Sequence, residues 1–204
     1  MTMPQTLNHL KESPSQTAGP YVHIGCVPNF AGIAGVFPQD LSSTMINADT
    51  QGERITITGC VWDGTGSPIK DALIETWQAD ANGIFPGNDP RGPADPNFTG
   101  WGRTAGDYDT GEWSFDTIRP GAVPFPDGRM QSPHISLWIV ARGINLGLHT
   151  RMYFPDAAID SDPILSRIEH RNRVPTLLAE QTDQNSYRFD IRLQGVDETV
   201  FFDF

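Results

Sequence analysis

The sequence predicts an all-β fold: a β-sandwich of short antiparallel strands with long loops, an irregular N-terminal arm and one or two short helices. Short strand-like segments, several of them alternating apolar and polar residues, recur from residue 54 to residue 193. The 204 residues include 20 Gly and 17 Pro without a repeating period, which is too many for a helical bundle and atypical of collagen. Long Gly- and Pro-containing loops between short strands are typical of sandwich architectures.

The first 50 residues lack any sustained period and are rich in Pro, Gly, Ser, Thr and Asn. We expect them to form an arm, residues 1–50, in front of a single domain, residues 51–204. Many arms are frayed, but this one contains the segment SQTAGPYVHIG, whose apolar and aromatic residues favour packing over exposure. The sequence therefore predicts an arm that packs on a partner chain.

The strands of the first half are predicted in order from residue 54. Residues 54–58 alternate with period two, and the turn cluster DGTGSP separates them from the next strand at 72–78. Residues 80–111 form a long loop, which in a compact domain is usually functional or part of an interface. A short strand is expected at 113–118, and a second loop covers residues 120–133.

The second half contains the most apolar strand and the expected helices. Residues 134–142 are predicted to form this strand and to pair antiparallel with residues 148–154. Short helices are expected at 163–169 and at 176–181, with Pro175 preventing a longer helix. An amphipathic strand and a hydrophobic tail, which should pack on this chain or on a neighbour, complete the prediction at residues 187–193 and 200–204.

The composition limits the classes of partner. Lys and Arg number 14 against 25 Asp and Glu, and the net charge of −11 argues against binding to nucleic acid or to an anionic membrane. No apolar stretch has the length of a signal peptide or of a membrane helix, so a cytoplasmic location is expected. Cys26 and Cys60 are too few for a disulfide framework and are expected to be buried free thiols.

Four long segments resemble a known family. They read GRTAGDYDTGEWSFDTIRPGAVPF, SPHISLWIVARG, LHTRMYF and YRFDIRLQG. Their sequence, order and spacing are similar to the core of the intradiol ring-cleaving dioxygenases, and the resemblance extends from about residue 53 to the C-terminus. Family members that cleave protocatechuate consist of α and β chains. Three further segments of this sequence resemble the α chains: SQTAGPYVHIG, WQADANG and ETVFFDF.

The resemblance implies a non-haem Fe(III) site, which the family builds from two tyrosinates and two histidines. A His-x-His pair supplies both imidazoles, because residues i and i+2 of a strand share one face. The corresponding positions of this chain hold His134, Ser136, Val123 and, directly after Ile84, Phe85. Only His134 could bind iron, so we expect no metal on this chain and assign the Fe(III) of the complex to a β chain.

The resemblance also implies a supporting role. In the family, α and β chains form a heterodimer that assembles into a larger heteromer, and the site of the β chain lies near their interface. An Arg of the α chain approaches the substrate there and corresponds to Arg142, which would attract the carboxylate of protocatechuate, with Arg151 as a rival. No catalytic residue is expected on this chain. The arm positions expected at the substrate are Thr17, Ala18, Gly19, Pro20 and Tyr21.

Two other functions stay open from the sequence. A self-sufficient dioxygenase would need a relocated iron site beside His134, with ligands from Tyr21, Tyr108, Tyr153 or Tyr187. A non-enzymatic β-sandwich that binds a protein or a small ligand would be a stable monomer. The apolar arm and tail favour instead a chain that a partner covers.

Overall fold

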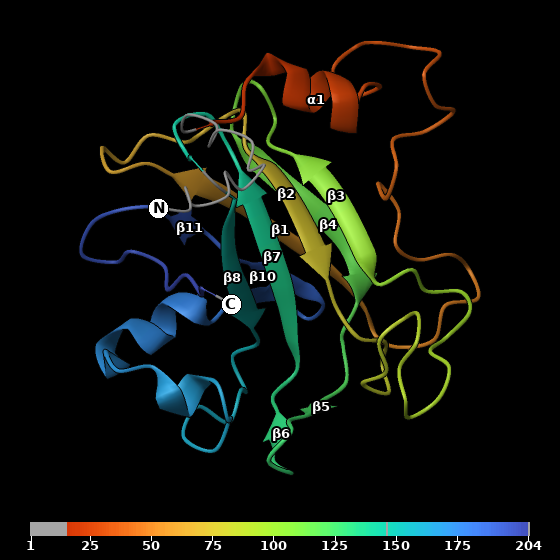
Figure 1. Ribbon diagram of the computed structural model, residues 1–204, viewed down its shortest axis with the longest axis vertical. Coiled ribbons are helices and arrows are strands. Elements are labelled where there is room, and N and C mark those ends of the chain that lie inside the picture. Colours follow the sequence, from red (N-terminus) through yellow and green to blue (C-terminus); the bar gives the residue numbers. More distant parts are fainter. Residues whose placement is uncertain (1–15, 146, 204) are drawn as a thin grey trace, which may run out of the picture.

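The computed structural model describes residues 16–145 and 147–203, which form a β-sandwich with short helices beside it (Figure 1). The first sheet contains β1 (Arg54–Trp62), β4 (Glu112–Ile118), β9 (Glu180–Asp183), β10 (Ser186–Arg188) and β11 (Ile191–Arg192). The second contains β2 (Leu73–Trp77), β3 (Trp101–Ala105), β7 (His134–Val140) and β8 (Leu148–Tyr153). The other elements are the hairpin β5 (Val123–Pro124) and β6 (Met130–Gln131), helix α1 (Pro20–Cys26) and the 3₁₀ helices η1 (Leu165–Arg167) and η2 (Arg171–Leu177). The predicted all-β class is confirmed.

Strand β1 is the centre of the first sheet. It pairs antiparallel with β4, and it pairs parallel with both β10 and β11. The prediction of antiparallel strands is therefore wrong for these two pairings. They are parallel because the chain returns to β1 after a long excursion through η2 and β9, whereas an antiparallel partner can follow a tight turn.

The second sheet has the strand order β3–β2–β7–β8 and is antiparallel throughout. Its β7–β8 pair confirms the predicted pairing of the two segments. Alternate residues of β7, namely Ile135, Leu137 and Ile139, are buried in the sandwich core, so the residues between them lie on the outer face. On that outer face, the register aligns one row of residues across the four strands: Trp101, Trp77, Ser136 and Arg151.

Large aromatic side chains form part of the core between the two sheets. Trp113 is 1% exposed, and its ring lies 6.0 Å from the ring of Phe115. The ring of Tyr187 meets Phe154 edge-on at 5.0 Å. Gly59 of β1 makes room for this core, since a Cβ there would lie 2.6 Å from the indole of Trp113. Each fully buried side chain of this size stabilises the fold by about 2–3 kcal/mol.

The arm, predicted to be irregular, contains helix α1. Pro20 occupies the first helical position, where its fixed φ and its missing N–H are both acceptable. The helix packs on the second sheet of the same chain, and Arg103 Nη1 donates a hydrogen bond to the carbonyl of Cys26 at 3.3 Å. The apolar contacts join Val22, Cys26 and Val27 to Leu73, Ala105 and Val140.

Both helices expected near the C-terminus need correction. Within residues 163–169 only the single 3₁₀ turn η1 forms. The helix expected at 176–181 is wrong, because η2 ends and β9 begins inside this range. Pro175 lies within η2, where a short 3₁₀ helix tolerates it, and its carbonyl accepts a hydrogen bond from the N–H of Leu178 at 3.1 Å.

The hydrophobic tail packs on this chain. The N–H of Phe202 donates to the carbonyl of His149 at 2.8 Å. Thr150 Oγ1 donates to the carbonyl of Val200 at 2.7 Å. The tail thus adds to the edge of the second sheet at β8.

The two cysteines are free thiols. Cys60 is buried, as predicted, whereas Cys26 at the end of α1 is only half-buried. Burial raises the pKa of the Cys60 thiol, although the guanidinium of Arg188 opposes the shift. A thiol with a raised pKa is a poor nucleophile, which fits a structural role.

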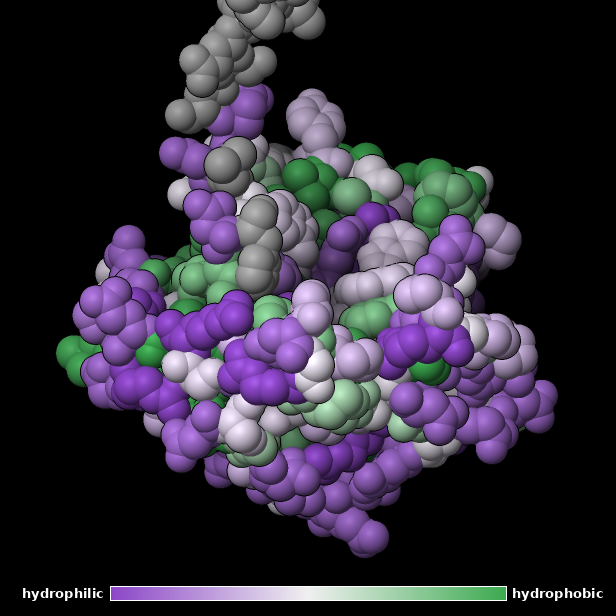
Figure 2. All heavy atoms as spheres, turned by 60° about the horizontal axis from the view of Figure 1, so that its bottom comes forward, coloured by the Kyte–Doolittle hydropathy of each residue, from purple (hydrophilic) through white to green (hydrophobic). Residues whose placement is uncertain are grey.

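Hydrophilic residues cover most of the face seen in Figure 2, and hydrophobic side chains gather there in small separate patches. This agrees with a chain whose net charge is −11. Among the helices of residues 16–145 and 147–203, none combines the length and the hydropathy that crossing a bilayer requires.

Candidate functional site

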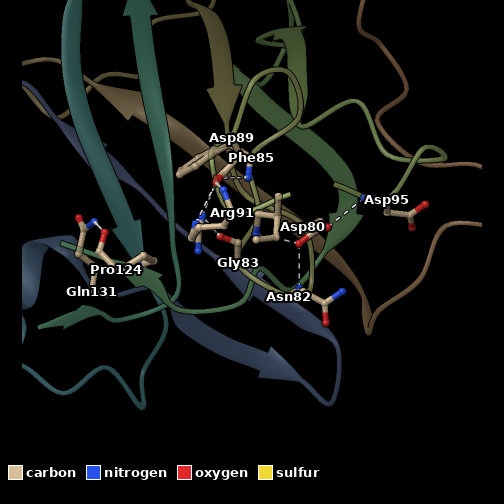
Figure 3. Close-up of polar contacts among 10 residues, drawn as sticks. Asp80, Asn82, Gly83, Phe85, Asp89, Arg91, Asp95, Pro124 and Gln131 are labelled. Atoms are coloured by element: carbon tan, nitrogen blue, oxygen red, sulfur yellow. Dashed lines mark hydrogen bonds and ion pairs between the residues drawn. The ribbon is translucent and has the colours of Figure 1, made fainter. Parts of the chain in front are cut away.

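Asp80 organises the loop that follows β2 and carries Phe85 (Figure 3). Asp80 is 2% exposed, and its Oδ1 accepts hydrogen bonds from the N–H groups of Asn82 and Ile84, both at 2.9 Å. Its Oδ2 accepts another from the N–H of Asp95 at 3.0 Å. A buried carboxylate that satisfies three backbone donors fixes a loop that has no regular structure.

The same loop contacts the segment in front of β5. The N–H of Gly121 donates to the carbonyl of Asp80 at 2.8 Å. At Gly83, whose φ is 78°, a Cβ would lie 2.1 Å from the carbonyl oxygen of Ala122. Any other residue there would strain the turn and collide with the backbone. This contact brings Phe85 and Val123 into one region of the fold.

Phe85 and Val123 are the residues that the sequence resemblance aligns with the family's two tyrosinates. The ring of Phe85 stacks on Trp77, with centroids 6.1 Å apart and planes inclined by 7°. Val123 is 7% exposed and pairs with Gln131 across the β5–β6 hairpin. Neither side chain has an atom that binds a metal.

Of the four positions given by the resemblance, His134 is the one predicted to be able to bind iron. It is 6% exposed, and its Nδ1 donates to the carbonyl of Ser132 at 2.8 Å. Its ring centroid lies 5.5 Å from that of Tyr153. Burial, and after it the positive charge of Arg151, lowers the pKa of His134 to about 4. The imidazole is therefore neutral at pH 7.

Ser136 follows His134 on the outer face of β7. The register places it opposite Trp77 of β2 and opposite Arg151 of β8. Arg151 Nη1 donates to Oε1 of Gln131 at 2.8 Å. Arg151 therefore lies beside the residue that the resemblance aligns with the family's second histidine.

These side chains do not fit a ferric ion. The four positions supply one imidazole, one hydroxyl and two hydrocarbon groups, whereas Fe(III) favours anionic oxygen ligands. Across residues 16–145 and 147–203, no group of three His, Cys, Asp or Glu side chains is arranged to hold a metal. We therefore assign no chemical step on this chain to iron.

The pKa of His134 predicts a loss of stability in mild acid. The pKa is about 4 in the folded chain and 6.5 ordinarily, so the unfolded chain binds the proton more tightly. The contribution of the neutral imidazole to the free energy of unfolding is complete above pH 6.5 and decreases as the pH falls towards 4. From pH 7 to pH 5, urea unfolding should show a loss about 2 kcal/mol larger for the natural chain than for His134→Gln. Equal losses in the two chains would contradict a buried neutral imidazole.

A second candidate site lies where the arm meets the end of β7. Gly19 is the extended residue that precedes α1, with φ −138° and ψ −170°. Thr17 Oγ1 accepts a hydrogen bond from the N–H of Gly143 at 2.8 Å and lies 3.4 Å from the carbonyl oxygen of Ala141. The arm is thus attached to the residues on both sides of Arg142.

Arg142 and Gly19 line one cleft of about 520 Å³. The Arg142 side chain is 73% exposed, and its Nε lies 2.8 Å from Oδ2 of Asp71. His23 forms part of the wall and is 5% exposed. Burial lowers the pKa of His23, and the nearby carboxylate of Asp71 opposes this shift. The other lining residues are Ile24, Ala31, Lys70 and Tyr108.

The structure brings part of the predicted arm site together. Gly19 and Arg142 share the cleft, and Thr17 is hydrogen-bonded beside it. Ala18 and Tyr21 are not among the lining residues of the cleft, and Tyr21 is 84% exposed.

The bond from Gly143 to Thr17 gives a direct test of arm attachment. Thr17→Val keeps the side-chain volume but removes the acceptor, so the arm should detach more often. We expect hydrogen exchange at the Gly143 amide to become about tenfold faster, which corresponds to the loss of one hydrogen bond. The Gly128 amide, which donates to Phe125 in a separate turn at 2.9 Å, provides the internal control. Unchanged exchange at Gly143 would show that the arm is held by other contacts.

The two candidate sites lie at opposite ends of β7. His134 begins the strand and Arg142 follows its end, a separation of roughly 25 Å in extended chain. In Figure 1, α1 lies near the head of the β7 arrow and the β5–β6 hairpin near its tail. Arg142 therefore cannot act on a molecule bound at its own chain's iron-ligand positions. Arg151, the rival candidate, lies at those positions and away from the arm.

The sequence predictions did not place three polar residues of this cleft beside Arg142. His23, Asp71 and Tyr108 come from the arm, from the turn before β2 and from the turn after β3. No spacing pattern links them, and the sequence contains no signal that could have joined them. The ring of Tyr108 lies 6.1 Å from His23, so the tertiary fold alone brings them together.

The tyrosines of a relocated iron site are dispersed. Only Tyr153 has its ring near His134, at 5.5 Å. Tyr187 is packed against Phe154, and Tyr108 belongs to the arm cleft. Burial raises the pKa of Tyr153 to about 12, which disfavours the tyrosinate that iron would need.

Comparison with known sequences gives close relatives over nearly the whole chain. The protocatechuate 3,4-dioxygenase alpha chain of Pseudomonas putida is 44% identical over 96% of this chain and 98% of its own length. The alpha chain of Burkholderia cepacia is 37% identical over 95% of this chain and 98% of its own length. The beta chain of the same organism is 34% identical over 81% of this chain and 75% of its own length.

Solved structures support the same fold. The 3-chlorocatechol 1,2-dioxygenase of Rhodococcus opacus 1CP superposes with a TM-score of 0.59 at 21% identity, covering 78% of this chain and 67% of that chain. A family model described as Dioxygenase matches residues 27–195. With most of its length matched by this model and close relatives at both α- and β-chain level, the chain belongs to the intradiol dioxygenase family.

Proposed function

We propose that this chain is the α subunit of a cytoplasmic protocatechuate 3,4-dioxygenase and that it carries no iron of its own. The complex would open the bond between the two hydroxyl-bearing carbons of protocatechuate. Both atoms of O₂ enter the product, 3-carboxy-cis,cis-muconate. The ferric iron and the chemical steps belong to a partner β chain, and this chain shapes the interface and the mouth of that site.

Its relatives support this assignment. Two of them are named alpha chains of protocatechuate 3,4-dioxygenase, and a third is named a beta chain. The likeness to the beta chain indicates that both subunits of such an enzyme share one fold. A pair of related chains, one with the iron ligands and one without them, accounts for the substitutions at Phe85, Val123 and Ser136.

The separation of Arg142 from its own chain's ligand positions carries the proposal. The cleft that contains Arg142 is too far from those positions to act on a molecule bound there. We therefore assign its positive charge to a substrate bound at the site of a second chain. Arg142 is 73% exposed and can exchange its bond with Asp71 for a substrate carboxylate. Because the chain has a net charge of −11, a local guanidinium is needed to attract an anionic substrate.

The arm offers the surface for this partner. Large apolar side chains between residues 21 and 41 remain partly exposed in the part of the chain that the structure describes. Such a group favours contact with another protein, and further copies would then build a larger heteromer. The exposed side chains are Tyr21, Ile24, Phe30, Ile33, Val36 and Leu41.

Purification with and without the partner tests the proposed function. The chain would be expressed alone and together with a β-type chain, and both samples measured for iron, for visible tyrosinate-to-Fe(III) absorption and for protocatechuate cleavage. We expect a colourless, inactive lone chain and a coloured, active complex. Colour and ring cleavage from the lone chain would instead support a relocated iron site. A stable monomer that does not bind the β chain would support the alternative of a non-enzymatic binding module.

A further inference from the structure

We propose that the guanidinium of Arg151 takes the place of the metal at the altered ligand positions and thereby excludes metal ions from them. The inference rests on family membership and on the assignment of the four positions. It does not depend on the partner chain or on the substrate.

Contacts on the outer face of the second sheet place Arg151 among the four positions. Ser136 is its direct neighbour across the β7–β8 pair. Its Nη1 is bonded to Gln131, which pairs with Val123 across the hairpin.

On the other side of Ser136, contacts made by Phe85 and its loop complete the group of four positions. Phe85 stacks on Trp77, which is the other cross-strand neighbour of Ser136. The loop of Phe85 in turn contacts the backbone in front of Val123 at Gly83. Arg151 therefore lies inside the group of segments that would surround an ion.

The positive charge of Arg151 influences the titratable side chains near these positions. It acts to lower the pKa values of His134, His149 and Tyr153. Burial is the larger cause at each group and raises the pKa of Tyr153 overall, so only the smaller, downward contribution comes from the cation. A metal ion placed among the same groups would be repelled by this cation at short range.

The ring of His134 is held in an orientation that suits a metal ligand. Its Nδ1 is held by the carbonyl of Ser132 at 2.8 Å, an arrangement that fixes the ring and leaves Nε2 as the ligating atom. Replacement of Ser136 by His would restore the His-x-His pair on one strand face. The cation opposite residue 136 would then oppose the binding of a metal ion by this pair of imidazoles.

Co²⁺ binding to the full-length chain tests the inference. Ser136→His would be compared with the double variant Ser136→His/Arg151→Gln by calorimetric titration, with the natural chain as the baseline. Gln at 151 retains an amide that can donate to Gln131, which preserves the fold, and circular dichroism would check this. We expect the double variant to bind Co²⁺ at least tenfold more tightly than Ser136→His.

Two matched variants separate local charge from its alternatives. Ser136→His/Arg54→Gln removes one positive charge on β1, and it should bind Co²⁺ as Ser136→His does. Ser136→His/Arg151→Lys keeps the charge without the guanidinium and should also remain within threefold of Ser136→His. Equal affinity with Arg151 present or removed would overturn the proposal. So would a Lys variant that binds as tightly as the Gln variant. The proposed function is tested separately, since these titrations need neither the β chain nor turnover.

Discussion

Arg142→Ala in the assembled complex should reduce kcat/KM for protocatechuate roughly 10- to 100-fold, through a higher KM. A charge-assisted bond to the substrate carboxylate is lost, and such bonds contribute about 1.5–3 kcal/mol. Catechol has no carboxylate, so its kcat/KM should change less than about twofold. Steady-state kinetics with both substrates measures the difference.

The expected result depends on a side chain that is available for binding. Arg142 is 73% exposed, so its truncation should leave the fold intact. Arg129→Ala removes another exposed arginine, paired with Asp127 at 2.7 Å, and should leave both substrates unaffected. Equal losses for protocatechuate and catechol after Arg142→Ala would show that Arg142 supports the interface and does not recognise the carboxylate.

Asp71 is the ion-pair partner with which the substrate carboxylate must compete for Arg142. Asp71 holds the guanidinium at 2.8 Å in the structure of the single chain. Substrate binding must therefore compete with an existing ion pair, and the pair also keeps the guanidinium near the cleft wall. An exposed pair of this kind is weak in water, so the competition costs little.

Strand positions could be predicted from the sequence because they depend on local patterns. Residues 54–58 alternate with period two and lie within β1, and the apolar segment from 134 forms β7. The partners of β1 could not be predicted, since parallel pairing with β10 and β11 is decided by the path of the chain between them. The helix expected at 176–181 is wrong because tertiary pairing with β10 draws part of this segment into β9.

The altered ligand positions are a prediction from the sequence alone, because the resemblance that gives them lies in long motifs with fixed spacing. The role of Arg151 could not, since its importance comes from lying opposite Ser136 and bonding Gln131. Asp71 and His23 were likewise missed in the arm cleft, because proximity between segments far apart in the sequence leaves no trace in local periodicity.

Asp162 connects the start of β7 to η1 and is fully buried. Its Oδ2 accepts a hydrogen bond from the N–H of Ser132 at 2.7 Å. Its Oδ1 accepts two more, from the N–H groups of Ile164 and Leu165 at 2.8 and 2.9 Å. Ser132 is the residue whose carbonyl fixes the ring of His134, so one carboxylate supports both a 3₁₀ turn and the candidate site.

Asp162→Ala should lower the free energy of unfolding by about 3–5 kcal/mol, because three buried backbone donors lose their acceptor at once. For a chain of this size, the melting temperature should fall by roughly 10 °C or more. Asp162→Asn keeps one accepting oxygen and should lose about half as much. Asp160→Ala is the matched control, since that side chain is 99% exposed and its pair with Arg171 contributes little. If Asp162→Ala melted within about 2 °C of the natural chain, water would have to replace the carboxylate at these donors, and the segment before β7 would be held by its other contacts.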